Sequence, residues 1–379
     1  MFHLLLLLFL YLYLAVSQAD VVHYLCSLHW GEPVAFRPKL TALLLVVFYA
    51  FILWGVRRLF APRKVGKLIG SVAVCWLTAA LLSAPFAGWA WQLGLLLVAL
   101  LLVWVDWRWN LHLLRRWGAG RNRWQKFMPR AVELLVLFLY VGLGTSVSDT
   151  DHYELRTARA LRSSRPREAY EVGSVHLAAS PRLFALRSYL LATTQPRGLG
   201  DKIFQQPIPA GGSAQLLFPR DDRQRLLFSP DSLTRLLGSE RRPGEPHLAY
   251  FRRCAEQARA QRPTTVERPL APIDYYLCAL LIDRRLDAFA LEVNRYYPHL
   301  VTTGRLPFYY AQALVLHSRQ HSHPVVRYRD AAIEANFRDY TEMGDTLSKV
   351  IPRRNLLRRS YGETYWWWYD YGQSGTAQP

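Results

Sequence analysis

The sequence predicts an all-α membrane protein with an apolar N-terminal part and a polar C-terminal part. Hydrophobic residues make up 51% of the 379 residues, but the long apolar runs all lie in residues 1–147. Residues 148–379 are rich in arginine, and their apolar side chains recur at helical spacing rather than in strand alternation. This second part is long enough to bury a core of its own. We therefore expect about five transmembrane helices followed by a domain of α-helical repeats.

Five apolar runs approach the roughly 20 helical residues that a bilayer core requires. The predicted spans are residues 2–16, 40–56, 68–87, 89–105 and 131–145. Pro85 favours a tight turn between the third and fourth runs, which would then form a helical hairpin. The first run has no basic residue before it and ends at Ser17-Gln18-Ala19, which loosely resembles a cleavage site. Residues 1–19 therefore fit either a retained span or a cleaved signal.

Basic residues alternate between the predicted loops and give an orientation. The loops after the second and fourth runs contain five and seven Lys and Arg residues, whereas the loop between the third and fourth runs contains none. The first loop has Arg37 and Lys39 against Asp20 and Glu32. Because Lys and Arg near membrane ends stay in the cytoplasm, the two basic loops are expected inside. The predicted location is the cell inner membrane, multi-pass, with the C-terminal domain in the periplasm.

Residues 148–364 are predicted to form helical pairs. The expected helices are 149–163, 166–178, 181–193, 230–237, 245–261, 272–282, 286–297, 306–319 and 325–345. Small residues such as Ala279 and Ala313 occur where neighbouring helices must approach closely. This organisation is typical of an irregular tetratricopeptide-like array. An irregular all-helical domain without repeats is the alternative.

Four stretches carry a resemblance to a known family. They are residues 149–169 (DTDHYELRTARALRSSRPREA), 199–212 (LGDKIFQQPIPAGG), 275–298 (YYLCALLIDRRLDAFALEVNRYYP) and 306–316 (LPFYYAQALVL). In their order and spacing the chain resembles an uncharacterised multi-pass membrane protein family of Bacteroidota. The resemblance implies several spans followed by an extracytoplasmic, tetratricopeptide-like domain. It includes no catalytic motif and implies no activity.

Two groups of residues suggest metal chemistry. His317, His321 and His323 have spacing that would place the first two on one helix face, but the closest downstream carboxylates are Asp330 and Glu334. A zinc site needs three or four ligands, and solvated histidines are common at a helix end, so we predict no metal ligands here. Asp149-Thr150-Asp151 matches the acid-x-acid pattern of metal-dependent glycosyltransferases. Such a short match occurs often by chance, and these residues also suit a helix N-cap.

Charge and cysteine usage exclude further functions. The net charge is +19, but acidic residues are interleaved with the basic ones in residues 148–379, so we expect no nucleic-acid binding. Cys254 and Cys278 are either a disulfide pair, which an oxidising compartment would permit, or buried thiols. Gly118-Ala119-Gly120 lacks the third glycine of a dinucleotide fingerprint. No catalytic site, cofactor or metal is therefore predicted.

Residues 365–379 form an aromatic C-terminal tail that begins Tyr365-Trp366-Trp367-Trp368-Tyr369. The tail is expected either to dock on the last helix pair or to contact the membrane interface or a partner peptide. Together these features favour a membrane-anchored periplasmic scaffold that binds an envelope protein. The alternative is an envelope enzyme acting on a glycan or a lipid-linked substrate. In both cases the lipid bilayer is a partner.

Overall fold

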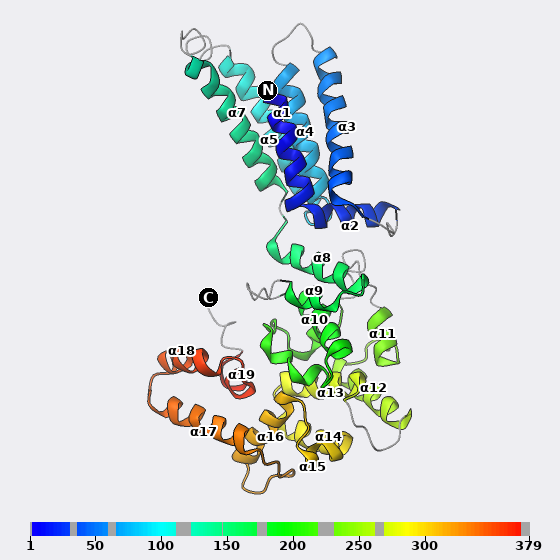
Figure 1. Ribbon diagram of the computed structural model, residues 1–379, viewed down its shortest axis with the longest axis vertical. Coiled ribbons are helices and arrows are strands. Elements are labelled where there is room, and N and C mark those ends of the chain that lie inside the picture. Colours follow the sequence, from blue (N-terminus) through cyan, green and yellow to red (C-terminus); the bar gives the residue numbers. More distant parts are fainter. Residues whose placement is uncertain are drawn as a thin grey trace. The chain divides into compact units, whose positions relative to one another are not determined.

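A computed structural model confirms that the protein is all-α. It describes residues 2–30, 36–59, 66–110, 123–145, 147–172, 180–218, 231–261 and 269–372. These residues form 18 α-helices, and within them no strand occurs (Figure 1). The chain divides into two compact units, Met1–Leu155 and Arg156–Pro379. Each unit is described by itself below.

The first unit consists of apolar helices. They are α1 (Phe2–Leu12), α2 (Ala19–Trp30), α3 (Pro38–Leu59), α4 (Gly66–Ser83), α5 (Trp89–Asn110) and α7 (Arg123–Gly144). The first helix packs inside this unit, because Phe9 stacks on Phe138 of α7 with ring centroids 3.9 Å apart. The hydroxyls of Tyr13 and Thr145 lie 2.8 Å apart and share a hydrogen bond. The predicted hairpin is present, since Gln92 of α5 donates its amide N–H to the hydroxyl of Ser83 at the end of α4.

The number of spans differs from the expected five. One helix, α3, is long and apolar enough to cross a membrane by itself, and the number is up to three if each of two bent helix pairs counts as one span. Apolar side chains cover the outside of α3, where Phe51 is 66% exposed and Leu44 is 62% exposed, as expected for contact with lipid. These apolar helices indicate membrane association.

The other predicted spans are each too short or too strongly bent to count as a single membrane-spanning helix. The first run ends in a π-helical turn, Tyr13–Ser17, and the chain bends by 79° into α2. The apolar parts of α4 and α5, Leu68–Ser83 and Trp89–Val105, each have fewer than 18 residues. At about 1.5 Å per residue they do not reach the 30 Å of a hydrocarbon core. The fifth run, in α7, meets the requirement for a span only when it is counted together with α8.

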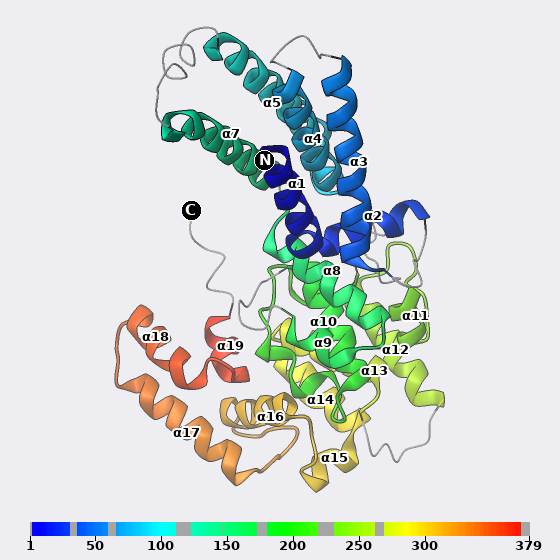
Figure 2. The same ribbon diagram turned by 45° about the horizontal axis from the view of Figure 1, so that its top comes forward.

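The second unit is built around one buried helix, α13 (Ala271–Ile282), in which every residue from Ile273 to Ile282 is buried. The helices of this unit are α8 (Asp149–Arg162), α9 (Pro166–Glu171), α10 (Pro181–Thr194), α11 (Asp231–Leu237), α12 (His247–Gln261), α14 (Leu286–Tyr296), α15 (Pro298–Thr303), α16 (Phe308–Gln320), α17 (Ala331–Asp345), α18 (Val350–Tyr361) and α19 (Tyr365–Tyr371). Three 3₁₀ turns lie between α10 and α11. They are Leu199–Asp201, Ile203–Gln205 and Gly212–Leu216. Helix α13 packs against α12 and α14, as Figure 2 shows. No repeat domain is identified among these elements, so the tetratricopeptide-like array stays a prediction.

The aromatic tail is a short helix that docks on the second unit. Trp366 is 1% exposed and packs against Tyr340 of α17 and Leu357 of α18. The N–H of Tyr365 donates to the side-chain oxygen of Gln312 at 2.7 Å, and its hydroxyl donates to the carbonyl of Leu281. The docking alternative is thus confirmed for Tyr365–Tyr371, and residues 373–379 lie outside the described part of the chain.

Candidate functional site

Three side chains that can bind a metal ion converge where α14 and α16 meet. They are Asp287, His317 and His321, and their ligand atoms all lie within 4.8 Å of one another. Among the residues that the structure describes, no other group of three His, Cys, Asp or Glu side chains meets this spacing. The group is therefore the first candidate for a functional site.

Two helices position these side chains. Asp287 lies in the first turn of α14, directly after the tight link that joins it to α13. His317 lies in the last turn of α16, and His321 is the extended residue that ends this helix. Their spacing of four residues brings the two rings together, with centroids 4.5 Å apart and planes at 29°. Because α14 packs against α16, the carboxylate of Asp287 lies beside both rings.

The distances within the group are short and nearly equal. The Oδ1 atom of Asp287 lies 3.3 Å from Nε2 of His317 and 3.3 Å from Nε2 of His321. The side chain of Asp287 is 79% exposed and that of His321 is 40% exposed, whereas that of His317 is 2% exposed. One side of the group thus faces solvent and the other lies in the protein interior.

The Nδ1 atoms of the two histidines indicate which ring nitrogen is free to bind a metal ion. Nδ1 of His321 lies 3.1 Å from the carbonyl oxygen of His317, and since a carbonyl accepts, this nitrogen is the donor. Nδ1 of His317 is buried and has no hydrogen-bond partner among the described residues. Burial lowers the pKa of His317, which favours its neutral imidazole, the form that binds metals.

The structure corrects the expectation of solvated histidines. His317 is buried, and the carboxylate beside it belongs to Asp287, thirty residues upstream, rather than to Asp330 or Glu334. Asp330 instead caps α17 and accepts hydrogen bonds from the N–H groups of Ala332 and Ile333. His323 is exposed and is not part of the group.

A polar hollow of about 430 Å³ is formed by residues that neighbour His317 and His321 in the sequence. It lies between the end of α16 and the start of α17. It is lined by Val315, Ser318, Arg319, Ser322, Pro324, Arg327, Tyr328, Arg329 and Glu334. We call this hollow the basic recess. Val326 and Tyr328 are buried and alternate with exposed Arg327 and Arg329, so the segment is pinned by its apolar side chains and presents its guanidinium groups outward. Arg319 lies 3.6 Å from Glu334, the acidic residue of the lining.

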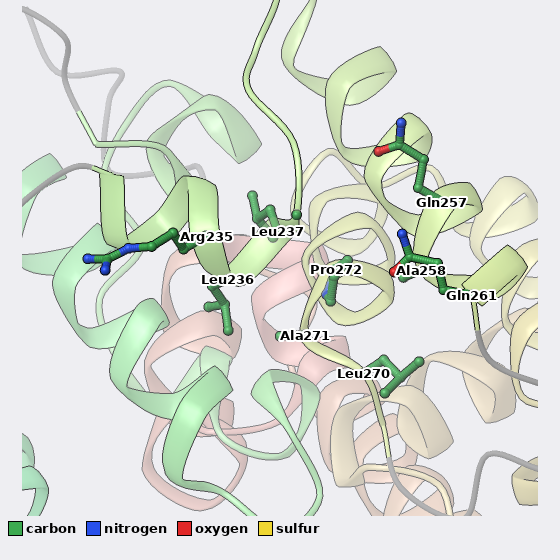
Figure 3. A pocket seen from close by; sticks show the side chains of 10 residues that line it. Arg235, Leu236, Leu237, Gln257, Ala258, Gln261, Leu270, Ala271 and Pro272 are labelled. Carbon is green, nitrogen blue, oxygen red and sulfur yellow. The ribbon is translucent and has the colours of Figure 1, made fainter.

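A second hollow, of about 320 Å³, lies between α11, α12 and the start of α13. Figure 3 shows Gln257 and Gln261 of α12 on one side, with Leu270 and Pro272 near the start of α13. The side chain of Arg235 points away from this space. The lining has no carboxylate, histidine or cysteine, so it suggests no catalytic chemistry.

A buried carboxylate of α13, Asp274, has a strongly raised pKa, and sequence reasoning missed it. Burial raises the pKa of Asp274 to about 7. Its side chain accepts hydrogen bonds from Tyr310, Tyr297 and the backbone N–H of Leu199. Through these hydrogen bonds Asp274 ties the turn before Leu199 to α13 and α16, which is a structural role.

The remaining sequence candidates have structural roles or lie elsewhere. Asp151 accepts hydrogen bonds from the N–H and hydroxyl of Ser148, so the acid-x-acid pattern forms a helix cap. Cys254 and Cys278 are buried free thiols and do not form a disulfide. Gly118-Ala119-Gly120 lies outside the described residues.

Comparisons with known proteins give one match. Residues 265–372 match the model of a family of unknown function (DUF6057). No curated protein and no solved structure matches the chain. The match names neither a group of organisms nor a tetratricopeptide repeat, so these parts of the resemblance stay predictions. The stretch that is similar to this family contains Asp287, His317, His321, the basic recess and α19.

Proposed function

We propose that this protein is a membrane-anchored binding protein that holds its second unit in the periplasm, where the basic recess receives an acidic segment of another envelope protein. The observation that carries the proposal is the charge of the recess. Arg319, Arg327 and Arg329 line it, against the single carboxylate of Glu334. Guanidinium groups bind carboxylates in a bidentate manner, and the hydroxyls of the lining add further hydrogen bonds.

The charge pattern of the first unit supports the periplasmic orientation. Helix α3 ends with Arg57 and Arg58, which favour a cytoplasmic location for this end. Helices α4 and α5 form a hairpin that returns the chain to the side from which it came, whether or not it crosses the whole bilayer. A single outward crossing by the bent pair of α7 and α8, counted as one span, would then bring the residues that follow it into the periplasm. The orientation thus does not depend on five complete spans.

The scaffold role extends the same proposal. The second unit is assembled from packed helices, including the neighbours α13 and α14 and the neighbours α16 and α17. A tetratricopeptide-like stacking of such pairs would present a long surface beside the recess. An envelope protein with an acidic terminus or loop is the partner that this surface fits best.

One observation favours the alternative, an envelope enzyme acting on a glycan or a lipid-linked substrate. Asp287, His317 and His321 converge at a solvent-facing position, as the titratable groups of an active site do. However, no carboxylate pair suited to glycoside chemistry lines the described hollows. Binding is therefore the better-supported function.

The test is co-purification from envelope membranes. The full-length protein, solubilised in detergent, is compared with Arg327→Glu/Arg329→Glu and with a matched control, Arg358→Glu/Arg359→Glu. The control places the same charge change on exposed residues of α18, outside the recess. We expect a specific envelope protein to co-purify with the wild type and the control and to be lost with the recess variant. Equal recovery with all three would contradict the proposal.

A further inference from the structure

We infer that Asp287, His317 and His321 form a binding site for one Zn²⁺ ion, with a fourth coordination position open to solvent. The inference concerns a different group of residues from the basic recess, and it goes beyond the proposed binding function. It follows from the type, spacing and burial of the three side chains.

The ligand set is one that zinc prefers. Zinc is commonly bound by histidine nitrogens and aspartate oxygens, and sites with three protein ligands leave one position for water or substrate. Two histidines four residues apart at the end of one helix, with a carboxylate from another helix, supply these three ligands. The C-terminal end of a helix also favours a cation because of the helix dipole.

The distances match tetrahedral coordination. Bonds from zinc to nitrogen or oxygen of about 2.0–2.1 Å place neighbouring tetrahedral ligands about 3.3–3.4 Å apart. The two observed distances from Oδ1 of Asp287 to the Nε2 atoms are both 3.3 Å. One ligand atom from each of the three side chains lies within 4.8 Å of the other two, so all three side chains can approach one ion.

The hydrogen bond of His321 orients its ring for metal binding. Nδ1 of His321 donates to the carbonyl of His317, so in the neutral imidazole the lone pair is on Nε2. Nε2 lies 3.3 Å from Oδ1 of Asp287, so both atoms could bind the same cation. A backbone carbonyl that accepts from the second ring nitrogen is also the usual partner of a metal-bound histidine.

His317 is the buried member of the group. Its side chain is 2% exposed, and its Nδ1 has no partner among the described residues. A zinc ion bound at Nε2 would leave the proton on Nδ1 without an acceptor, so coordination at Nε2 alone would orient this ring. The ion would link α14 to α16 through this buried ligand.

The experiment measures zinc binding by the full-length protein, purified in detergent without a polyhistidine tag. Metal is removed with a chelator, Zn²⁺ is titrated by calorimetry, and bound zinc is then counted by mass spectrometry. The test variants are Asp287→Asn and His321→Ala, which change exposed side chains and leave the buried His317 in place. The matched control is His323→Ala, an exposed histidine two residues from His321 that is outside the group.

We expect one Zn²⁺ per chain in the wild type and in the control, and affinity reduced at least about 100-fold in both test variants. Circular dichroism checks that each variant keeps its helical content. If the wild type binds no zinc, the three groups form only a hydrogen-bonded ion pair and the inference is overturned. Equal zinc binding by all four proteins would overturn it as well, because the ion would then lie elsewhere.

Discussion

The hydroxyl of Tyr310 donates a hydrogen bond to the carboxylate of Asp274, 3.1 Å away in the centre of the second unit. Tyr297 donates to the same oxygen at 3.3 Å, and the backbone N–H of Leu199 donates to the other oxygen at 3.0 Å. Asp274 is 0% exposed, so three hydrogen bonds replace its hydration. This buried acid joins three segments that are far apart in the sequence.

The first prediction follows from the pKa of Asp274, which burial raises from 3.8 to about 7. Because the folded state holds the proton more tightly than the unfolded state, stability contributed by protonated Asp274 is present below about pH 4 and is lost as pH rises through about 7. The thermal midpoint should therefore fall more steeply between pH 5 and pH 8 in the wild type than in Asp274→Asn, which cannot titrate there. Parallel pH profiles for the two proteins would contradict the raised pKa.

A second prediction concerns Gly198, which lies against Asp274. Its φ is +73°, and a Cβ atom at this position would lie 1.8 Å from Oδ2 of Asp274. Gly244 has nearly the same φ of +74° but open space around it, so it controls for the positive φ. Gly198 also has a ψ of −167°, a combination that is essentially restricted to glycine and costs about 1–3 kcal/mol in other residues. Gly198→Ala should cost clearly more than Gly244→Ala, because the Asp274 carboxylate must also move.

Chemical denaturation measures both free energies of unfolding. The difference between the two glycine variants measures the steric conflict with Asp274 together with the added strain from the ψ of Gly198. Equal losses in Gly198→Ala and Gly244→Ala would mean that the turn before Leu199 can move away from Asp274 without cost.

Periodicity predicted the helices of the second unit well where capping and turn signals were strong. Residues 272–282 and 286–297 were expected to be helical, and the structure has Ala271–Ile282 and Leu286–Tyr296. The helix expected from residue 325 begins instead at Ala331. Asp330 caps it, and residues 325–330 are outside the helix, with Val326 and Tyr328 buried. Apolar spacing alone does not distinguish such a non-helical segment from a helix.

The candidate site could be predicted only in part. The four-residue spacing placed His317 and His321 together, because it is a property of one helix. Asp287 is on another helix, and its position depends on how α14 packs against α16. No local pattern in the sequence encodes that packing. The buried Asp274 was missed for the same reason, since its three donors come from three separate segments.

The third prediction concerns the docked tail. Trp366 is fully enclosed by α17 and α18, whereas the neighbouring Trp367 is only partly buried. Truncation of a buried tryptophan typically costs about 3–5 kcal/mol. Trp366→Ala should therefore lower the thermal midpoint by roughly 10 °C, and Trp367→Ala should lower it much less. Equal midpoints in the wild type and Trp366→Ala would show that the tail contributes no stability. Contact of the tail with the membrane interface would then be the favoured explanation of its aromatic residues.

The last prediction is the orientation on which the proposed function depends. Basic residues resist translocation, and acidic residues contribute little. Arg123, Lys126 and Arg130 lie at or near the start of α7, and Asp149 and Asp151 follow its end. Alkaline phosphatase requires an oxidising compartment for its disulfides, so fusion after Thr150 should give activity and fusion after Arg121 should give none. Immunoblots of the two fusions control for the amount of protein. The reverse pattern would place residues 148–379 in the cytoplasm and would remove the case for an envelope partner at the basic recess.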